Sequence, residues 1–394
     1  MRIAKLETFH ADGGWRVFSF LKVTTDEDLV GWAEYADGFG AGGLTELLHR
    51  FARVVKGMDP RAIGKISASL QANTRLATGG LNAQAIGAIE NACLDIKAKA
   101  LGVPVYELFG GPYRERLPLY WSHCGSFRVW QRDFFENELG LPPIRTVDDV
   151  TDLGREAVQR GFRAIKTNPL PLWPESKPFN SGFRIGPDLL ERRPMNWVID
   201  EMKQVLGAFR EGIGPDTALL FDLNFSQRTE GFVRIARALE EFNLTWLEID
   251  MHDPDALAYI RSRSRVPIAS LEAIHGLHGY RPYLAQRAAD VAVVDVVWNG
   301  LLESTRIATL ADAYETDCAP HNFYGDLASI MSAHFCAAIP NFRIMEIEVD
   351  DVPWKSDLVT NPPVIERGEL MVPQGPGWGT EVNEEALKEH PPRR

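Results

Sequence analysis

The most constraining feature of this sequence is a regular alternation of short strand-like runs with amphipathic helical runs, which starts near Leu117. The strand-like runs are rich in β-branched and other apolar residues: "LPLYWS", "FRAIKTN", "ALLFDLN", "LTWLEID", "VPIASLE", "DVAVVDVV", "DCAPHN" and "FRIMEIEV". Runs such as "TEGFVRIARALEEFN" and "GLLESTRIATLADAYE" lie between them and carry apolar residues at helical spacing. Strands that alternate with helices form right-handed βαβ units around a parallel sheet. Eight strands with seven intervening helices predict an α/β fold of the closed-barrel type.

An open, doubly wound sheet is the alternative, but no glycine-rich phosphate turn follows the first strand. At 394 residues the chain is too long for one ordinary domain. Residues 1–115 lack the strand–helix period and predict an α+β domain. We expect a barrel over 116–356 and a C-terminal segment, 357–394, whose short strand "GELMVP" and turn "QGPGWGT" return to the first domain.

Two segments exceed the usual length of a loop between a strand and a helix. Residues 124–148 and 169–194 each follow the end of a predicted strand and are rich in proline and aromatic residues. Each is either a surface excursion or oligomer contact, or a cover over the barrel mouth, where barrel enzymes work.

Composition limits the partners. The net charge of −12 disfavours nucleic acid, although a local site can still attract an anion. The N-terminus has no apolar signal core and no run approaches membrane-spanning length, so we expect a cytoplasmic protein without a membrane partner. The four cysteines show no C-x-x-C spacing and are expected to be reduced.

Seven of the eight predicted strands end with one ionisable side chain. In strand order from the second strand these are Lys166, Asp222, Glu248, Glu272, Asp295, His321 and Glu346, and the steps from Asp222 onward are 23 to 26 residues. The carboxyl ends of barrel strands share one mouth, so we expect these side chains to converge there. Any single one of them would be dismissed as an ordinary residue at the start of a loop.

The residue types in this set suggest a division of labour. Asp222, Glu248 and Glu272 would repel one another unless a cation lay between them, and all-oxygen ligands favour Mg²⁺. The alternative is that these carboxylates cap helices or pair with arginines such as Arg265. An aspartate beside His321, namely Asp295, would fix the imidazole tautomer and raise its basicity. A hard dication, a base and a lysine on one mouth suit removal of a proton next to a carboxylate.

The ordered set of motifs resembles the enolase superfamily, mandelate racemase subgroup, over nearly the whole chain. The matching fragments are "AIENACLDIKAKALGVPVYELFGG", "AIKTN", "FDLNFSQ", "LEID", "SLEAIHG", "DVVWNG", "APHNFYG" and "GPGWGTEVNEEAL". The resemblance implies an α+β capping domain and a modified (β/α)₇β barrel. It also implies that Asp222, Glu248 and Glu272 hold Mg²⁺, and that Asp295 and His321 form the Asp–His dyad of the family. Glu346 would hydrogen-bond the substrate carboxylate.

This sequence departs from the family pattern at three of these strands. Asp250 stands where a proline follows the second metal ligand, and Leu271 precedes Glu272 in place of glycine. Many relatives carry Lys-x-Lys on the second strand, whereas here Lys166 is followed by Asn168. Lys166 would neutralise a substrate carboxylate oxygen, and Asn168, which cannot exchange a proton near neutral pH, would orient a substrate group.

His321 is then the one strong base, which favours loss of water from a sugar acid to give a 2-keto-3-deoxy acid. A racemase or 2-epimerase and a lactone cycloisomerase use the same enediolate and are the alternatives. Some relatives have a histidine as leaving-group acid two residues after the first metal ligand, where this chain has Asn224. His321 acting twice, Tyr324 or a capping-domain residue could replace it. Asn224 and Asn322 are expected to bind the substrate.

The substrate is expected to be a small carboxylate, and polar residues of "FHADGGW" together with "DGFGAGG" would meet it from the capping domain. We also expect a homo-oligomer. Two readings from other classes remain. A Schiff-base aldolase would use Lys166 without metal. A barrel without catalysis would serve as a binding protein, and it would not need ionisable residues at matching positions of successive strands.

Overall fold

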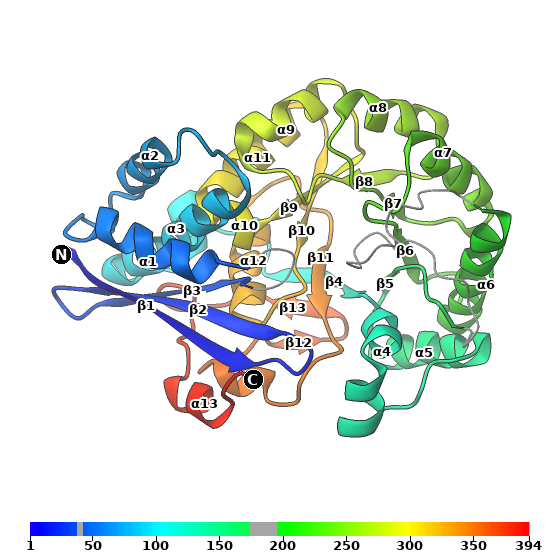
Figure 1. Ribbon diagram of the computed structural model, residues 1–394, viewed down its shortest axis with the longest axis horizontal. Coiled ribbons are helices and arrows are strands. Elements are labelled where there is room, and N and C mark those ends of the chain that lie inside the picture. Colours follow the sequence, from blue (N-terminus) through cyan, green and yellow to red (C-terminus); the bar gives the residue numbers. More distant parts are fainter. Residues whose placement is uncertain (38–41, 173–194, 394) are drawn as a thin grey trace.

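The computed structural model describes residues 1–37, 42–172 and 195–393 (Figure 1). The chain begins with an antiparallel sheet of β1 (Ile3–Asp12), β2 (Val17–Thr25) and β3 (Val30–Tyr35). The helices α1 (Leu44–Val55), α2 (Ile63–Asn73) and α3 (Gly80–Leu101) and the short η1 (Val105–Phe109) follow. This is the predicted α+β texture, without any strand–helix repeat.

The alternation from Leu117 onward is confirmed, because a strand overlaps each predicted run. These strands are β4 (Arg116–Ser122), β5 (Ala164–Thr167), β6 (Ala218–Asp222), β7 (Trp246–Glu248), β8 (Ile268–Ser270), β9 (Val291–Asp295), β10 (Asp317–His321) and β11 (Met345–Glu348). The main intervening helices are α5 (Val147–Gln159), α6 (Asn196–Ile213), α7 (Thr229–Ala238), α8 (Pro254–Arg263), α9 (Gly276–Ala285), α11 (Leu301–Ala313) and α12 (Asp326–Ala338). Short helices are η4 (Glu240–Phe242) and α10 (Val296–Asn299).

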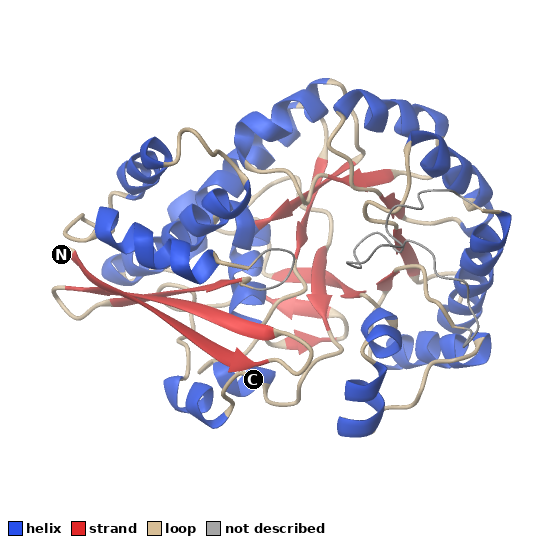
Figure 2. Ribbon diagram, viewed as in Figure 1, coloured by secondary structure: helices blue, strands red, loops and turns tan. Residues whose placement is uncertain are grey.

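The strands close into a barrel. From β4 to β10 each strand pairs in parallel with the next, and β11 pairs in parallel with β4. The seam between β10 and β11 is bridged just before β11, where Cys318 N–H donates to the Asn341 carbonyl at 2.7 Å and its carbonyl accepts from Arg343 N–H at 2.9 Å. Figure 2 shows the strands at the centre with helices around them. The barrel prediction is therefore confirmed, and the open-sheet alternative is excluded.

The first domain docks on the barrel through α3, which is buried over most of its length. Asn91 accepts a hydrogen bond from Leu301 N–H at 2.8 Å and donates one to the Val296 carbonyl at 3.1 Å. Gly87 faces Gly300 so closely that a Cβ atom on Gly87 would lie 2.7 Å from the Gly300 nitrogen. Glycine at this position lets the two backbones approach.

The C-terminal segment contains η5 (Lys355–Leu358), β12 (Ile365–Glu366), β13 (Glu369–Met371) and α13 (Glu384–Glu389). Its return to the first domain is made by Trp378, whose Nε1–H donates to the Trp32 carbonyl at 2.8 Å and whose backbone N–H donates to Asp95 at 3.0 Å. The short strand predicted in "GELMVP" was expected to return to the first domain. It forms β13, which pairs with barrel strand β4. The domain boundaries at 115 and 356 stay predictions.

Of the two long segments, 124–148 lies wholly within the described residues. It forms α4 (Ser126–Trp130) and the π-helical turn η2 (Asp133–Glu138), and it buries Phe127, Phe134 and Phe135. Phe127 stacks on Trp15 of the first domain, with ring centroids 4.0 Å apart. The segment therefore joins the first domain to the mouth of the barrel. Most of 169–194 lies outside the described residues, as do residues 38–41 of "DGFGAGG".

The four cysteines are buried and form no disulfide, as expected. Among the described helices, none has the length and apolar character to cross a membrane.

Candidate functional site

Asp222 and Glu248 lie opposite each other on the adjacent strands β6 and β7. Both are buried, and both face the equally buried Lys166 of β5. Lys166 Nζ lies 3.1 Å from a Glu248 oxygen, 3.6 Å from an Asp222 oxygen and 2.9 Å from a Glu346 oxygen. Burial acts to lower the pKa of Lys166, but the carboxylates outweigh it and raise that pKa, so the side chain is an ammonium group.

Glu272 was predicted at the end of a strand, but β8 ends two residues earlier at Ser270. Between them Leu271 has a φ of 95°, a backbone conformation that L-residues rarely adopt and that turns the chain here. Glu272 nevertheless reaches the mouth, where one oxygen lies 3.4 Å from His321 Nε2. The turn at Leu271 could not be read from the spacing.

The acidic cluster has the electrostatics of a cation site. Burial and then the neighbouring carboxylates raise the pKa of Asp222 to about 6 and that of Glu248 to about 8, although Lys166 acts to lower both. Asp250, two residues after Glu248, is buried, and its Oδ2 has no hydrogen-bond partner among the described residues. Burial and the nearby Glu272 raise the pKa of Asp250 well above its usual value. So much buried negative charge calls for a compensating cation.

The donor set fits Mg²⁺ in kind, because it offers carboxylate oxygens from the ends of β6 and β7 and from the turn after β8, and no thiolate. In the described part of the chain, no three His, Cys, Asp or Glu side chains already form a ready-made metal group. Lys166 contacts Asp222 and Glu248, so these two carboxylates face an ammonium group.

His321 and Asp295 lie on the far side of the mouth from Lys166, on the adjacent strands β10 and β9. His321 Nδ1 lies 2.6 Å from Asp295 Oδ2, which also accepts a hydrogen bond from the Tyr324 hydroxyl at 2.6 Å. The other oxygen of Asp295 accepts from Trp298 N–H at 2.7 Å and thereby caps α10. Burial acts to lower the pKa of His321, but Glu272 and Asp295 raise it to about 10. The imidazole is thus held firmly, with Nε2 toward Glu272.

Glu346 of β11 is fully buried and engaged on both oxygens. Lys166 and the Ser122 hydroxyl bind one oxygen, and Asn322 N–H donates to the other at 2.8 Å. Burial raises the pKa of Glu346, but Lys166 and His321 outweigh it and lower that pKa to about 2. The Asn322 side-chain amide donates to Ser329 at 3.0 Å and to the Glu346 carbonyl at 3.1 Å.

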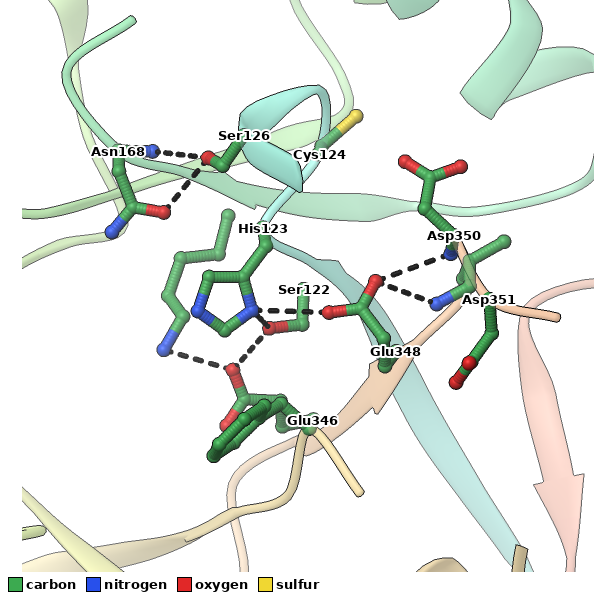
Figure 3. Close-up of polar contacts among 12 residues, drawn as sticks. Ser122, His123, Cys124, Ser126, Asn168, Glu346, Glu348, Asp350 and Asp351 are labelled. Atoms are coloured by element: carbon green, nitrogen blue, oxygen red, sulfur yellow. Dashed lines mark hydrogen bonds and ion pairs between the residues drawn. The ribbon is translucent and has the colours of Figure 1, made fainter. Parts of the chain in front are cut away.

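Asn168 and Asn224 form hydrogen bonds with neighbouring protein groups. Asn168 Oδ1 accepts from the Ser126 hydroxyl at 2.8 Å (Figure 3), and its Nδ2 donates to the Asp222 carbonyl at 3.3 Å and to Asn224 at 3.4 Å. Asn224 donates from its backbone and its side chain to Asp222 at 2.8 and 3.1 Å. Both asparagines therefore hold Asp222 in place, a contact that the sequence did not predict.

The first domain covers this mouth from one side. Arg16 contacts the Phe323 and Tyr324 carbonyls and pairs with Asp351, which ties the β1–β2 loop to the loop after β10. A cavity of about 230 Å³ lies between these loops, lined by Trp15, Arg16, Val17, Phe18, Glu34, Tyr35, Ala36, Asp37, Phe323 and Tyr324. A larger cavity of about 490 Å³ lies among α1, α2 and α3, away from these charged groups. The smaller cavity reaches the mouth through Tyr324, whose hydroxyl donates to Asp295.

Sequence reasoning missed the contribution of the first barrel strand. Ser122 ends β4 and bonds to Glu346, and His123 follows it with a φ of 47°. The signal was present, because "LPLYWSH" places a polar pair, Ser122 and His123, at the end of the first strand. His123 falls one residue beyond the end of β4 and so stands outside the regular series of strand-end residues that starts at Lys166.

Comparison with known proteins agrees with this geometry. Residues 149–386 match the family described as "Enolase C-terminal domain-like", and residues 13–110 match the mandelate racemase / muconate lactonizing enzyme N-terminal domain. A crystal structure from Burkholderia xenovorans LB400 that carries the name of an L-alanine-DL-glutamate epimerase superposes with a TM-score of 0.94. It is 41% identical and covers 100% of this chain and 99% of its own. The same protein was also solved bound to magnesium and fumarate.

Among curated proteins, the chain is similar to a D-xylonate dehydratase of Haloferax volcanii, with 27% identity over 98% of this chain and 88% of that protein. It is also similar to a D-gluconate dehydratase of Thermoproteus tenax, with 27% identity over 96% of this chain and 71% of that protein. The matches to the two family models are consistent with the capped barrel and with the charged side chains around its mouth. The chain belongs to the mandelate racemase/muconate lactonizing enzyme family of the enolase superfamily.

Proposed function

We propose that this protein is a Mg²⁺-dependent dehydratase that removes the C2 proton of a sugar acid and expels the 3-hydroxyl as water, giving a 2-keto-3-deoxy acid. The observation that carries this proposal is the arrangement of the mouth: a buried acidic cluster and Lys166 on one side, and a single aspartate-held histidine, His321, on the other.

Asp222, Glu248 and Glu272 would hold the metal, which when bound supplies positive charge to the oxygens of the substrate carboxylate. Lys166 would neutralise a carboxylate oxygen of the substrate, exchanging part of its present ion pairing for that contact. With Glu272 engaged by the metal, the charge that does most to raise the pKa of His321 would be compensated, and His321 would take the C2 proton on Nε2, because Nδ1 is held by Asp295.

Dehydration is favoured over epimerisation by Asn168. Inversion at C2 normally uses proton donors on both faces, and the strand-two position that carries a lysine in many relatives is here an amide. The amide bonds to Ser126, Asp222 and Asn224 and has no proton to exchange near neutral pH. This weighs against carrying over the epimerase name of the 41%-identical structure. The dehydratase names of the curated relatives support a polyhydroxy acid as substrate class.

The test is proton NMR of the purified protein with Mg²⁺ in D₂O against D-xylonate, D-gluconate, D-galactonate and aldaric acids. Loss of one acid's signals, growth of a 2-keto-3-deoxy product and abolition by EDTA would support dehydration. Inversion or exchange at C2 without loss of water would overturn it in favour of an epimerase, and an isomerised lactone would indicate a cycloisomerase. Activity that resists EDTA and is trapped by borohydride would point to Lys166 as an imine-forming amine. We expect the protein to be cytoplasmic and to form a homo-oligomer. Light scattering can check the oligomeric state.

A further inference from the structure

Asp250 is a buried carboxylate next to the proposed metal ligands, and the reaction described above gives it no role. It is 3% exposed, and its Oδ2 has no hydrogen-bond partner among the described residues. Burying a charged oxygen without a partner is costly, so buried carboxylates are as a rule paired or bound to a metal. The unsatisfied oxygen of Asp250 therefore points to a ligand.

The backbone directs Asp250 to the same face as Glu248. Trp246 and Glu248 share one face of β7, and Trp246 Nε1–H donates to Glu248 at 3.0 Å. The extended pairing continues beyond the end of this strand, because Ile249 N–H donates to the Ala269 carbonyl at 3.0 Å. Side chains two residues apart in an extended segment point to the same side. Asp250 therefore follows Glu248 toward the mouth of the barrel.

Neighbouring segments hold Asp250 and Glu272 together. The Asp250 N–H donates to the Asn224 carbonyl at 3.1 Å, which ties this residue to the loop after β6. The turn that carries Glu272 is held by the Tyr280 hydroxyl, which lies 2.9 Å from the Leu271 carbonyl. The carboxyl groups of Asp250 and Glu272 lie within hydrogen-bonding distance of each other. Two anchored backbone segments thus bring two carboxylates to one point.

Positive charge reaches only part of this acidic cluster. Lys166 serves three other carboxylates of the mouth, namely Asp222, Glu248 and Glu346. Glu272 has His321 Nε2 at 3.4 Å, whereas Asp250 forms no ion pair with a lysine, arginine or histidine of the described residues. Two buried carboxylates in contact are stable only when they share a proton or a cation. The deficit of positive charge therefore lies on the side of Asp250 and Glu272.

We propose that Asp250 is a fourth carboxylate ligand of the divalent cation, which binds between Asp250 and Glu272. This inference rests on the proposed Mg²⁺-dependent function and extends its set of three ligands. The number of charged ligands tunes the affinity of an all-oxygen site for a divalent cation. A fourth carboxylate therefore lets the site hold its cation before any substrate arrives.

Metal titration without substrate tests the assignment. Asp250→Asn keeps the shape of the side chain and removes its charge, so isothermal titration calorimetry with MgCl₂ or MnCl₂ should show an affinity at least about tenfold weaker. Asp253→Asn is the matched control, since Asp253 is exposed and caps the start of α8. Asparagine caps a helix as well as aspartate does, and a distant exposed charge is screened, so this variant should stay within about twofold of the wild type.

Thermal unfolding separates a metal ligand from a structural carboxylate. After treatment with EDTA, Asp250→Asn should melt at a higher temperature than the wild type, because the neutral amide does not repel Glu272. The same concentration of Mg²⁺ should then raise the Tm of the wild type more than that of the variant, since tighter binding stabilises the folded state more. A variant that melts below the wild type both with EDTA and with Mg²⁺ would overturn the assignment in favour of a structural role.

The affinities distinguish the remaining outcomes. Unchanged or tighter Mg²⁺ binding in Asp250→Asn, with weaker binding in Glu272→Gln, would overturn the assignment and indicate that Asp250 shares a proton with Glu272. The proposed dehydration would survive that result. If the wild type itself binds neither Mg²⁺ nor Mn²⁺, the metal-dependent function is wrong and the ligand assignment fails with it.

Discussion

His321 and Asp295 lie directly opposite each other on neighbouring parallel strands, with His321 Nδ1 2.6 Å from Asp295 Oδ2. The strand register thus makes the hydrogen bond, and the aspartate fixes which nitrogen faces the acidic cluster. The Tyr324 hydroxyl donates a hydrogen bond to the same oxygen, Asp295 Oδ2, and helps to hold the carboxylate in place.

His321→Asn should reduce C2 deuterium exchange and water loss together, by about 10²–10⁴-fold, because it removes the base of the first step. NMR in D₂O measures both quantities in one sample. Tyr324→Phe is the matched control: it removes one hydrogen bond to Asp295 and leaves the imidazole pair, so we expect less than about a tenfold effect. Exchange that persists in His321→Asn would assign proton removal to another group.

Glu272→Gln should weaken Mg²⁺ binding by at least about tenfold, because one carboxylate oxygen donor becomes a weaker amide donor. Isothermal titration calorimetry with MgCl₂ measures this without any substrate. Asp290→Asn is the control, since Asp290 pairs with Arg261 on the outside of the barrel. Unchanged Mg²⁺ affinity in Glu272→Gln would remove Glu272 from the ligand set.

Glu34→Ala should destabilise the docking of the first domain on the barrel. The Glu34 carboxylate accepts the N–H groups of Gly325 and Ala328 at 2.7 and 2.9 Å, at the start of α12. Leaving two buried N–H groups without a partner costs about 2–4 kcal/mol, which urea denaturation measures. Glu34→Gln keeps an acceptor oxygen and should lose less, and similar losses in both variants would contradict this account.

Stability should depend on pH through His334. Its Nδ1 accepts from Tyr106 N–H at 3.3 Å and its Nε2 lies 3.2 Å from the Trp378 carbonyl, so the neutral ring fits both partners. Burial lowers its pKa to about 4, against an ordinary value of 6.5. The unfolded chain therefore binds the proton first, and the free energy of unfolding falls as pH drops from 6.5 to 4, by up to about 3 kcal/mol from this residue.

The check on His334 is the difference between the wild type and His334→Gln over pH 4–7. Glu34 and Glu90, whose pKa values burial raises to about 7, contribute in the opposite direction, since folded protein then holds their protons more tightly than the unfolded chain. They titrate in both proteins and cancel in the difference. A stability difference that does not narrow as pH falls would exclude this role for His334.

The barrel could be predicted from the sequence because its strands are short, apolar and regularly spaced, and the helices between them have their own period. Asp222, Asp295 and His321 end strands as expected. Glu272 reaches the mouth only through the turn at Leu271, and a left-handed backbone at a leucine has no sequence signature.

Hydrogen-bond partners were beyond prediction for a different reason. Asn168 and Asn322 were expected to face the substrate, but each has protein donors and acceptors within reach that only the folded neighbours reveal. The pairing of β13 with β4 was missed because a short apolar strand fits either domain equally well. His123 could have been found from the sequence, whereas its pairing with Glu348 depends on closure of the barrel.

That closure joins residues that are far apart along the chain. Ser122 and Glu346 are 224 residues apart and His123 and Glu348 are 225 apart, whereas His321 and Asp295 are separated by only 26. During synthesis on a ribosome, neither Ser122–Glu346 nor His123–Glu348 can form until the last barrel strand, β11, has emerged. The residues of the His321–Asp295 pair emerge before that strand. In the complete chain Lys166 shares its charge among Asp222, Glu248 and Glu346, and Glu346 is supplied by β11. We expect the complete mouth to appear only as the final event of folding, so that a partly made chain is inert toward its substrate.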